Sequence, residues 1–255
     1  MTKIIGLIPA RMAASRFPGK PLFPIFGRPM IEHVFERARQ FGRWDVLAIC
    51  TCDEEIRAFA ESKGYPVIMT ADTHTRALDR VAEATTKCGI AVSDNDIVLN
   101  VQGDEPMMHP AMITATIQPM EEHAHVRGTM LAMDIVDEAQ FRNPDTLKII
   151  HDLSGRVLYT SRQPIPHCKQ FGPELEAKRI YGIFGFRWEF LKLFTQLPPS
   201  PLEIKEACDS NRLYDHGFHQ HIAPYPFCPS YSVDSPHDIG IVEAAMAKDP
   251  LWGSY

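Results

Sequence analysis

The sequence has 255 residues, of which 45% are hydrophobic and 23% charged, and its formal net charge at pH 7 is −6. These proportions are typical of a soluble globular protein with one large domain, or one domain carrying an insertion. The acidic balance argues against a nucleic-acid partner, which requires a basic surface. No apolar run approaches the length that spans a membrane, and we expect a cytoplasmic protein without a signal peptide.

The chain begins with an apolar run that leads into a cationic loop. Ile4 to Ile8 is typical of a buried parallel strand, and Pro9 is expected to end it. The loop that follows contains three cations and several small residues: Arg11, Arg16 and Lys20, with Ala10, Ala13, Ala14, Ser15 and Gly19. Small residues let backbone N–H groups approach an anion, and neighbouring cations complete a phosphate-binding cradle. The loop is neither a Walker loop nor a GxGxxG loop.

Strands and helices alternate through the rest of the first half. Helices are predicted at about 30–41, 54–63 and 79–88, and strands at 46–52, 66–69 and 96–102. Asp53 is expected to cap the helix that follows it. The alternation predicts a βαβ sheet with right-handed crossovers. Because ligands of such sheets bind beyond the carboxyl ends of the strands, we expect the cationic loop and residues 103–105 to meet there.

The second half is less regular and predicts an excursion rich in β structure. Helices are predicted at 110–123, 203–214 and 236–248, with another ending near 196, and strands at 129–135, 147–151, 157–161, 180–186 and 219–223. Residues 153–156 are a plausible turn between antiparallel strands. The fold class is therefore α/β, with a mixed, mostly parallel sheet flanked by helices.

Two aspartates are candidates for a metal site. Asp104 lies at the mouth of the strand that ends near Gln102, where a carboxylate is placed to hold Mg²⁺, a hard cation that binds carboxylate, water and phosphate oxygens. A strand-end aspartate is often only a turn residue, but a phosphate cradle needs a metal to offset triphosphate charge. Asp234 is the second candidate; it either binds the metal or caps the last helix, and Ser235 is an alternative cap.

The cysteines and histidines form no pattern typical of a metal site or of covalent catalysis. The six cysteines include one Cys-x-Cys pair at 50–52 but no second cluster at zinc spacing, and we expect reduced thiols. The His-x-His pairs at 123–125 and 219–221 have no evident carboxylate or cysteine partner, and they are interpreted as surface or edge residues. No GxSxG or Cys–His signature is present.

The loop pattern PAR-x4-RxPGKPL resembles the signature loop of the sugar nucleotidyltransferases. Nearly the whole chain resembles the cytidylyltransferases that activate 3-deoxy-D-manno-octulosonate, through agreeing segments at 28–34, 99–106, 143–145, 161–166, 198–203 and 233–238. The resemblance implies a single nucleotidyltransferase domain of the nucleotide-diphospho-sugar transferase type. Its nucleotide-binding half would be at about 1–106, and its sugar-binding and dimerisation half at about 107–255.

The same resemblance implies roles for individual residues. The nucleotide would be bound by Pro9, Ala10, Arg11, Arg16, Lys20, Arg80 and Gln102. Catalysis is assigned to Arg16, Lys20 and Asp104, and the Mg²⁺ ligands are Asp104 and Asp234. The acceptor side is assigned to Gln102, Arg162, Ile180, Tyr181, Asp209 and Ser210. In the implied reaction, the anomeric hydroxyl of an acidic 3-deoxy-2-keto sugar attacks the α-phosphorus of CTP in line, and pyrophosphate leaves. The implied protein is a homodimer of lipopolysaccharide biosynthesis.

Three segments depart from the family pattern. Residues 75–80 read TRALDR where the family carries SGTDR, which leaves the preference for CTP over other triphosphates open. Ile180 stands in place of a histidine that reaches the sugar, and residues 208–212 replace the family's LEQLR. The changes either adapt the site to another acid, such as an amino-octulosonate, a nonulosonate or a phosphonate, or are drift in an enzyme for the parent octulosonate.

Two other functions compete with this interpretation. A glycosyltransferase that uses a nucleotide sugar would need a DxD metal motif, and Asp94-x-Asp96 has these letters but precedes its strand. A nucleotide-sensing protein without catalysis would be favoured by the loss of Lys20, Asp104 or Asp234. All three are present, so the sequence favours the enzyme.

Overall fold

The computed structural model describes residues 2–13 and 16–255 of the chain. Ala14 and Ser15, two of the small residues predicted for the phosphate cradle, lie outside the described residues. The chain forms two compact units, Met1–Thr114 with Pro229–Tyr255, and Ala115–Cys228. The C-terminal stretch that contains Asp234 therefore belongs to the same unit as Lys20 and Asp104.

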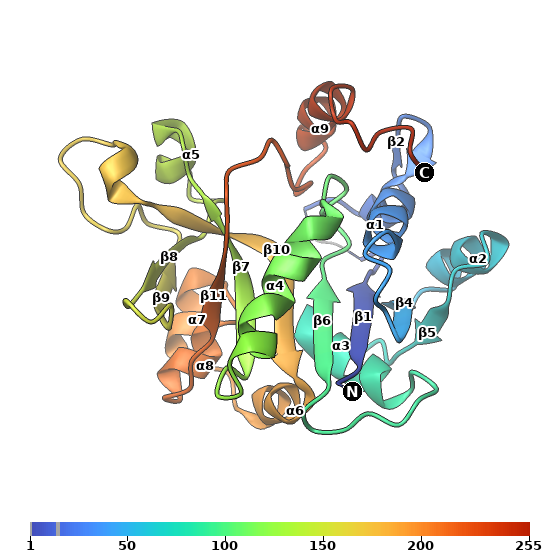
Figure 1. Ribbon diagram of the computed structural model, residues 1–255. Helices are drawn as coiled ribbons and strands as arrows, with labels where there is room; N and C mark the ends of the chain where they lie inside the picture. The colour runs from blue at the N-terminus through green and yellow to red at the C-terminus, as the bar shows by residue number, and fades with distance from the viewer. Residues whose placement is uncertain (1, 14–15) are drawn as a thin grey trace. The chain divides into compact units, whose positions relative to one another are not determined.

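A parallel sheet organises the first unit (Figure 1). Its strands follow the order β6 (Ile97–Val101), β1 (Ile4–Pro9), β4 (Val46–Thr51) and β5 (Val67–Met69), and each neighbouring pair is parallel. The four strands predicted for this half are confirmed, although β1 continues through Pro9. Apolar side chains fill β1 and β6 because both faces of a parallel sheet are buried.

The helices of the first unit surround this sheet. They are α1 (Met30–Arg39), α2 (Glu54–Ser62), α3 (Ala77–Thr86), the beginning of α4 (Pro110–Glu122) and α9 (Asp238–Met246), with a short 3-10 helix at Lys20–Leu22 and a small ribbon of β2 (Pro24–Ile25) and β3 (Arg28–Pro29). Helix α3 packs against β1, β4 and β6. A separate apolar cluster joins Phe17 of the cationic loop to Val233 and to Val242 of α9.

The second unit contains mixed β structure. Strand β7 (Gly128–Asp134) pairs antiparallel with β10 (Lys178–Arg187) and parallel with β11 (His221–Tyr225), while β8 (Lys148–His151) pairs antiparallel with both β10 and β9 (Val157–Ser161). The predicted hairpin of β8 and β9 is confirmed. The helices are α5 (Glu138–Arg142), which the sequence analysis did not predict, α6 (Trp188–Gln196), α7 (Pro201–Glu206) and α8 (Asn211–Asp215).

The predicted continuous helix over 203–214 is wrong, because the chain breaks into α7 and α8. Ala207 adopts a left-handed conformation with φ of 47°, which ends α7. The break is stabilised by a buried ion pair in which Arg212 of α8 reaches back to Glu203 of α7 at 2.7 Å. Residues 208–210 therefore lie in a turn.

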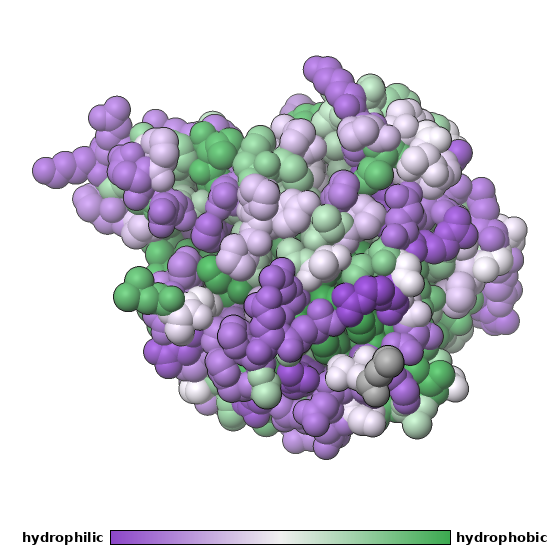
Figure 2. All heavy atoms as spheres, in the orientation of Figure 1, coloured by the Kyte–Doolittle hydropathy of each residue, from purple (hydrophilic) through white to green (hydrophobic). Residues whose placement is uncertain are grey.

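The predicted α/β class with a mostly parallel sheet is confirmed. Within the part of the chain that the structure describes, no helix is both long enough and apolar enough to cross a membrane. Figure 2 shows polar residues over much of one face of the molecule, with apolar residues in smaller groups among them.

Candidate active site

A cavity of about 260 Å³ opens in the first unit beyond the carboxyl ends of β1 and β6. It brings together every residue of this unit that the sequence analysis assigned to nucleotide or metal: Pro9, Ala10, Arg11, Arg16, Lys20, Arg80, Gln102, Asp104 and Asp234. Because β1 and β6 are parallel neighbours, the loops that follow them are expected to meet at this edge of the sheet. The three predicted cations and both predicted carboxylates thus line one cavity.

Two glycines allow these loops to approach. A Cβ atom on Gly103 would lie 2.8 Å from the carbonyl oxygen of Pro9, so a side chain there would push the ends of β6 and β1 apart. Gly19 has φ of 76°, in the left-handed region that favours glycine, and its N–H donates to the carbonyl of Met12 at 2.9 Å. The chain then enters the 3-10 helix at Lys20.

Asp53 is the N-cap residue of α2, as predicted, but its side chain does not cap the helix. Its carboxylate makes no cap hydrogen bond and instead accepts one from the backbone N–H of Met12 at 2.7 Å. This contact fixes the start of the cationic loop against the end of β4. Asp53 is therefore a supporting residue of the cavity that sequence reasoning assigned to a local role.

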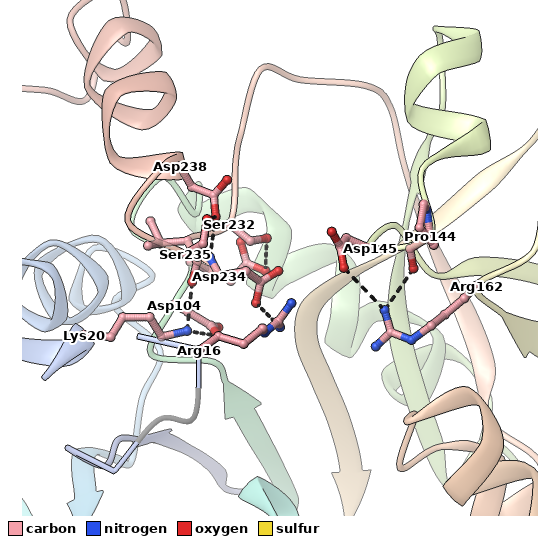
Figure 3. Close-up of polar contacts among 12 residues, drawn as sticks. Arg16, Lys20, Asp104, Pro144, Asp145, Arg162, Ser232, Asp234, Ser235 and Asp238 are labelled. Carbon is pink, nitrogen blue, oxygen red and sulfur yellow. Dashed lines mark hydrogen bonds and ion pairs between the residues drawn. The ribbon is translucent and has the colours of Figure 1, made fainter. Parts of the chain in front are cut away.

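Lys20 and Asp104 form an ion pair within the cavity (Figure 3). The Nζ atom of Lys20 lies 2.8 Å from Oδ2 of Asp104 and also donates to the carbonyl of Val233 at 2.8 Å. Both side chains are largely buried, with 13% and 27% of their surface exposed. The contacts hold the ammonium between the strand end and the C-terminal segment.

Arg16 and Asp234 form the second ion pair, with Nη2 of Arg16 2.7 Å from Oδ1 of Asp234 (Figure 3). Asp234 does not cap the last helix. The carboxylate of Asp238 accepts hydrogen bonds from the backbone N–H groups of Asp234 and Ser235 and from the hydroxyl of Ser235. Because Asp238 stabilises this turn, the Asp234 carboxylate is left for the cavity.

The segment that carries Asp234 is fixed beside the end of β6. Val233 is fully buried, and its N–H donates to the carbonyl of Asp104 at 2.9 Å. Ser232 donates to Glu105 at 2.8 Å, and Ser230 donates to the carbonyl of Met107 at 3.1 Å. The two candidate metal ligands are therefore held on two strands of chain that run side by side.

The electrostatics of the cavity fit a divalent cation. Burial raises the pKa of Asp234, the negative charge of Asp104 raises it further, and Arg16 and Lys20 oppose both effects. Two carboxylates that repel each other are stabilised by a cation between them. No group of three His, Cys, Asp or Glu residues within the described ranges is arranged to hold a metal by itself. Mg²⁺ suits such a site, because it binds one or two carboxylates and completes its shell with water and phosphate oxygens.

The remaining wall is formed by residues 74–77, between β5 and α3. Arg80 is buried and donates to the Thr70 hydroxyl at 2.5 Å and to the carbonyl of Ala71 at 3.3 Å. Glu83 accepts hydrogen bonds from Ala71 N–H at 3.0 Å and from His74. His74 was not predicted as a cavity residue, although its position beyond the carboxyl end of β5 is a signal that could have indicated it.

The predicted acceptor residues other than Gln102 belong to the second unit. Arg162 directly follows β9, and Asp209 and Ser210 lie in the turn between α7 and α8. Ile180 and Tyr181 are consecutive residues of β10, so their side chains lie on opposite faces of the strand. Tyr181 is fully buried, whereas Ile180 is half-buried. These positions leave their assignment to the acceptor a prediction.

Other motifs have structural explanations. The carboxylate of Asp96 accepts hydrogen bonds from the backbone N–H groups of Lys3 and Ser93, at the opposite end of β6 from Asp104. The Asp94-x-Asp96 sequence is therefore not a metal motif of this cavity. The rings of His125 and His221 lie with their centroids 5.7 Å apart. All six cysteines are free, as predicted.

The sequence profile described as Cytidylyltransferase matches residues 5–221. The chain belongs to the cytidylyltransferase family. It is 41% identical over 241 residues to the 3-deoxy-manno-octulosonate cytidylyltransferase of Nitratidesulfovibrio vulgaris (strain DP4), covering 93% of each chain. It is 38% identical to the 8-amino-3,8-dideoxy-manno-octulosonate cytidylyltransferase of Shewanella halifaxensis (strain HAW-EB4), covering 95% of this chain and 98% of the relative.

A solved structure of a family member has the same architecture. The CMP:2-keto-3-deoxy-manno-octonic acid synthetase complexed with CTP aligns with a TM-score of 0.87 and 32% identity, over 97% of this chain and 99% of that one. A glucose-1-phosphate thymidylyltransferase described as putative, from Bacillus anthracis, aligns with a TM-score of 0.61 at 14% identity, covers 94% of each chain, and supports the fold alone. The predicted family and fold are confirmed.

Proposed function

We propose that this protein transfers a CMP group from CTP to an acidic 3-deoxy-2-keto sugar, with 3-deoxy-manno-octulosonate as the first candidate, and releases pyrophosphate. The observation that carries the proposal is the convergence of three cations and two carboxylates in one cavity of a cytidylyltransferase-family chain. The relatives named for octulosonate and the solved structure with CTP support the choice of both substrates.

The residues of the cavity divide the reaction among them. Arg11, Arg16 and Lys20 would bind the triphosphate, and guanidinium groups can grip phosphate oxygens in a planar fork. The anomeric hydroxyl of the sugar attacks the α-phosphorus in line and loses its proton to solvent. A new P–O bond forms, and the bond between the α-phosphorus and the oxygen that bridges to the β-phosphate breaks. Lys20 and Arg16 would stabilise the charge that develops on the departing pyrophosphate. Such chemistry relies on positioning and charge neutralisation rather than on a covalent intermediate.

Asp104 and Asp234 would hold Mg²⁺, which supplies charge neutralisation at phosphate oxygens and lowers the pKa of a nearby hydroxyl when it is bound. In the structure the same two carboxylates pair with Lys20 and Arg16. Binding of the nucleotide would draw these cations to the phosphates and leave the carboxylates for the metal.

An amino sugar is the second candidate acceptor. The relative named for 8-amino-3,8-dideoxy-manno-octulosonate is 38% identical to this chain. Asp209 would supply a negative charge that suits an amino substituent, and Ile180 an apolar surface in place of a polar contact. We also propose a cytoplasmic homodimer that serves lipopolysaccharide biosynthesis, which rests on the family resemblance.

The decisive test is pyrophosphate release with CTP and Mg²⁺ across a panel of acids. The panel contains 3-deoxy-manno-octulosonate, its 8-amino analogue, N-acetylneuraminate and simple phosphonates. Turnover on octulosonate supports the first candidate, and turnover confined to the amino analogue supports the second. Intact CTP binding without turnover on any acid would contradict the proposed reaction but would still support the assignment of the cavity as a nucleotide site.

A further inference from the structure

Lys148, the first residue of β8, is fully buried in the second unit. Its ammonium donates three hydrogen bonds, all to main-chain carbonyls, at 2.9 Å to Asn143, 2.5 Å to Thr146 and 2.6 Å to Arg162. An ammonium has three N–H donors, so its hydrogen-bonding capacity is filled. The part of the chain that the structure describes offers Lys148 no carboxylate at ion-pair distance. A buried lysine of this kind needs an explanation, because burying a charge without a countercharge is costly.

The three carbonyls belong to two segments that Lys148 ties together. Asn143 and Thr146 flank the turn after α5, whereas Arg162 follows β9. The side chain of Arg162 depends on the same turn, since its Nη1 atom donates to the carbonyl of Pro144 at 2.9 Å (Figure 3). Lys148 therefore fixes the turn that contains Pro144, whose carbonyl orients the Arg162 guanidinium.

A second set of contacts completes the support of Arg162. Its Nε atom donates to the carbonyl of Glu206 at 2.9 Å, and its backbone N–H donates to the Glu206 carboxylate at 2.8 Å. The other oxygen of that carboxylate accepts from the hydroxyls of Tyr159 and Ser161, each at 2.7 Å. Among the described residues, the Nη2 atom of Arg162 has no hydrogen-bond partner, and the side chain is 31% exposed. The arrangement holds a guanidinium in place with one nitrogen left for a ligand.

We propose that Lys148 is a positioning residue for the acceptor: it holds the 143–146 turn against Arg162, so that Nη2 of Arg162 is fixed to receive an anionic group of the acid. The inference rests on the proposed function and on the assignment of Arg162 to the acceptor that the family resemblance implies. Guanidinium groups are suited to carboxylates, which every acid of the proposed class carries. Fixing the donor in advance reduces the entropy lost when the acid binds.

The positioning requires the charged form of Lys148. A neutral amine has two N–H donors and a lone pair, so it would lose one hydrogen bond and set the lone pair against a carbonyl oxygen. Burial lowers the pKa of Lys148 to about 8, the charge of Arg162 acts in the same direction, and Glu206 opposes them.

Lys148 is the group in this cluster whose charge is expected to change in mildly alkaline solution. The other charged groups that face it are Arg162, Arg179 at its register position on β10, Asp145 in the turn, and Glu206 of α7.

Steady-state kinetics of Lys148→Met, with each substrate varied in turn, test the proposal. We expect KM for the acid to rise about tenfold or more, because a displaced guanidinium binds its anion poorly. KM for CTP and kcat should change by less than about threefold, as for loss of a contact that is made equally in the ground state and the transition state. Lys178→Met is the matched control, since Lys178 is a β10 lysine that pairs with Asp134 at 2.6 Å and does not contact Arg162. An unchanged acid KM, or an equal loss for both substrates, would overturn the proposal.

Lys148→Arg keeps a permanent charge and provides a test that does not require removal of the side-chain charge. In the wild-type protein, KM for the acid should rise above about pH 8 as Lys148 loses its proton. In Lys148→Arg that rise should be absent, and its persistence would contradict a role for Lys148 protonation.

A spectroscopic measurement separates this inference from the proposed reaction. The Nη1–H of Arg162, which donates to the Pro144 carbonyl, should give a slowly exchanging NMR signal in the wild type and in Lys178→Met, and a rapidly exchanging one in Lys148→Met. A protected signal in Lys148→Met would overturn the positioning role whatever the turnover shows. If the wild type shows no turnover but the exchange pattern is as expected, the proposed reaction is wrong. The role of Lys148 in positioning Arg162 would then still hold.

Discussion

The cationic side chains of the predicted sites have different hydrogen-bond partners in the two units. In the first unit, Lys20 and Arg16 pair with Asp104 and Asp234, which are themselves candidate metal ligands. In the second unit, Lys148 and Arg162 donate to main-chain carbonyls. The first set includes carboxylate side chains that a ligand can displace, whereas the second set is part of the backbone.

This difference indicates two modes of ligand binding. Ion pairs at exposed positions contribute about 0–1 kcal/mol, so Arg16, with 57% of its side chain exposed, can exchange Asp234 for a phosphate at little cost. Carbonyl contacts inside a folded segment have no such exchange partner. The nucleotide site is therefore expected to rearrange when CTP and metal bind, whereas the support of Arg162 is already built.

The largest effect is expected from Asp104, the less exposed of the two carboxylates in the cavity. Asp104→Ala should lower kcat on the order of a hundredfold or more, because it removes a candidate metal ligand and the partner of Lys20. Lys20→Ala should cause a loss of similar size. Pyrophosphate release at saturating CTP and Mg²⁺ measures both.

Asp94→Ala is the control for Asp104→Ala, because it removes the same charge from an exposed position outside the cavity. We expect its turnover to match the wild type. Near-normal turnover of Asp104→Ala at saturating Mg²⁺ would mean that the metal assignment is wrong.

The next effect tests how tightly the loops of the first unit are packed. In Gly103→Ala the new Cβ would lie 2.8 Å from the carbonyl oxygen of Pro9, and we expect a loss of about 2 kcal/mol of stability. Urea unfolding measures it. Gly240→Ala is the matched control, since a Cβ there meets nothing within 4 Å. Equal midpoints for the two variants would show that the loops can move apart freely.

The sequence predicted the first unit well because its site obeys a rule of the fold. The cationic loop and Asp104 both follow neighbouring parallel strands, so their convergence could be inferred from the order of strands and loops along the chain. Asp234 is 130 positions after Asp104 in the numbering, and only the family motif could connect the two.

The errors arose where a distant partner outweighed a local preference. Asp53 has the sequence position of a helix cap, but its carboxylate binds Met12, a contact 41 residues away that local reasoning does not contain. The helical pattern over 203–214 is interrupted because Arg212 returns to a buried Glu203. The support of Arg162 by carbonyl groups was equally invisible, since any residue type supplies a carbonyl.

A smaller effect tests the exchange of partners directly. Mg²⁺ should raise the affinity for CTP roughly tenfold, because nucleotide that takes Lys20 and Arg16 leaves two repelling carboxylates for the metal. Calorimetric titration with CTP, in EDTA and in Mg²⁺, measures this coupling. It should weaken in Asp234→Asn and persist in Asp72→Asn, an exposed control outside the cavity. Equal affinities in EDTA and Mg²⁺ for the wild type would contradict the exchange.

The smallest effect concerns the cavity wall at residues 74–77, which the Glu83 carboxylate supports through hydrogen bonds. Burial raises the pKa of Glu83, but hydrogen bonds from Lys87, from Ala71 N–H and from His74 outweigh burial and lower the pKa to about 2. The folded protein therefore favours the ionised form. The stability that this carboxylate contributes is present above its ordinary pKa of 4.5 and is lost as the pH falls towards 2.

Glu83→Gln should lower the free energy of unfolding by about 1 kcal/mol at neutral pH, since its hydrogen bonds are partly exposed. The difference from the wild type should shrink as the pH falls below 4.5, because the wild-type carboxylate then begins to be protonated on unfolding. Glu61→Gln removes a more exposed glutamate that pairs with Arg57, and it should show little effect at either pH. If the difference in the free energy of unfolding for Glu83→Gln is the same at pH 7 and in acid, this wall is stabilised by packing rather than by the charge of Glu83. The contrast between displaceable side-chain partners and fixed partners would then apply to the phosphate side of the cavity alone.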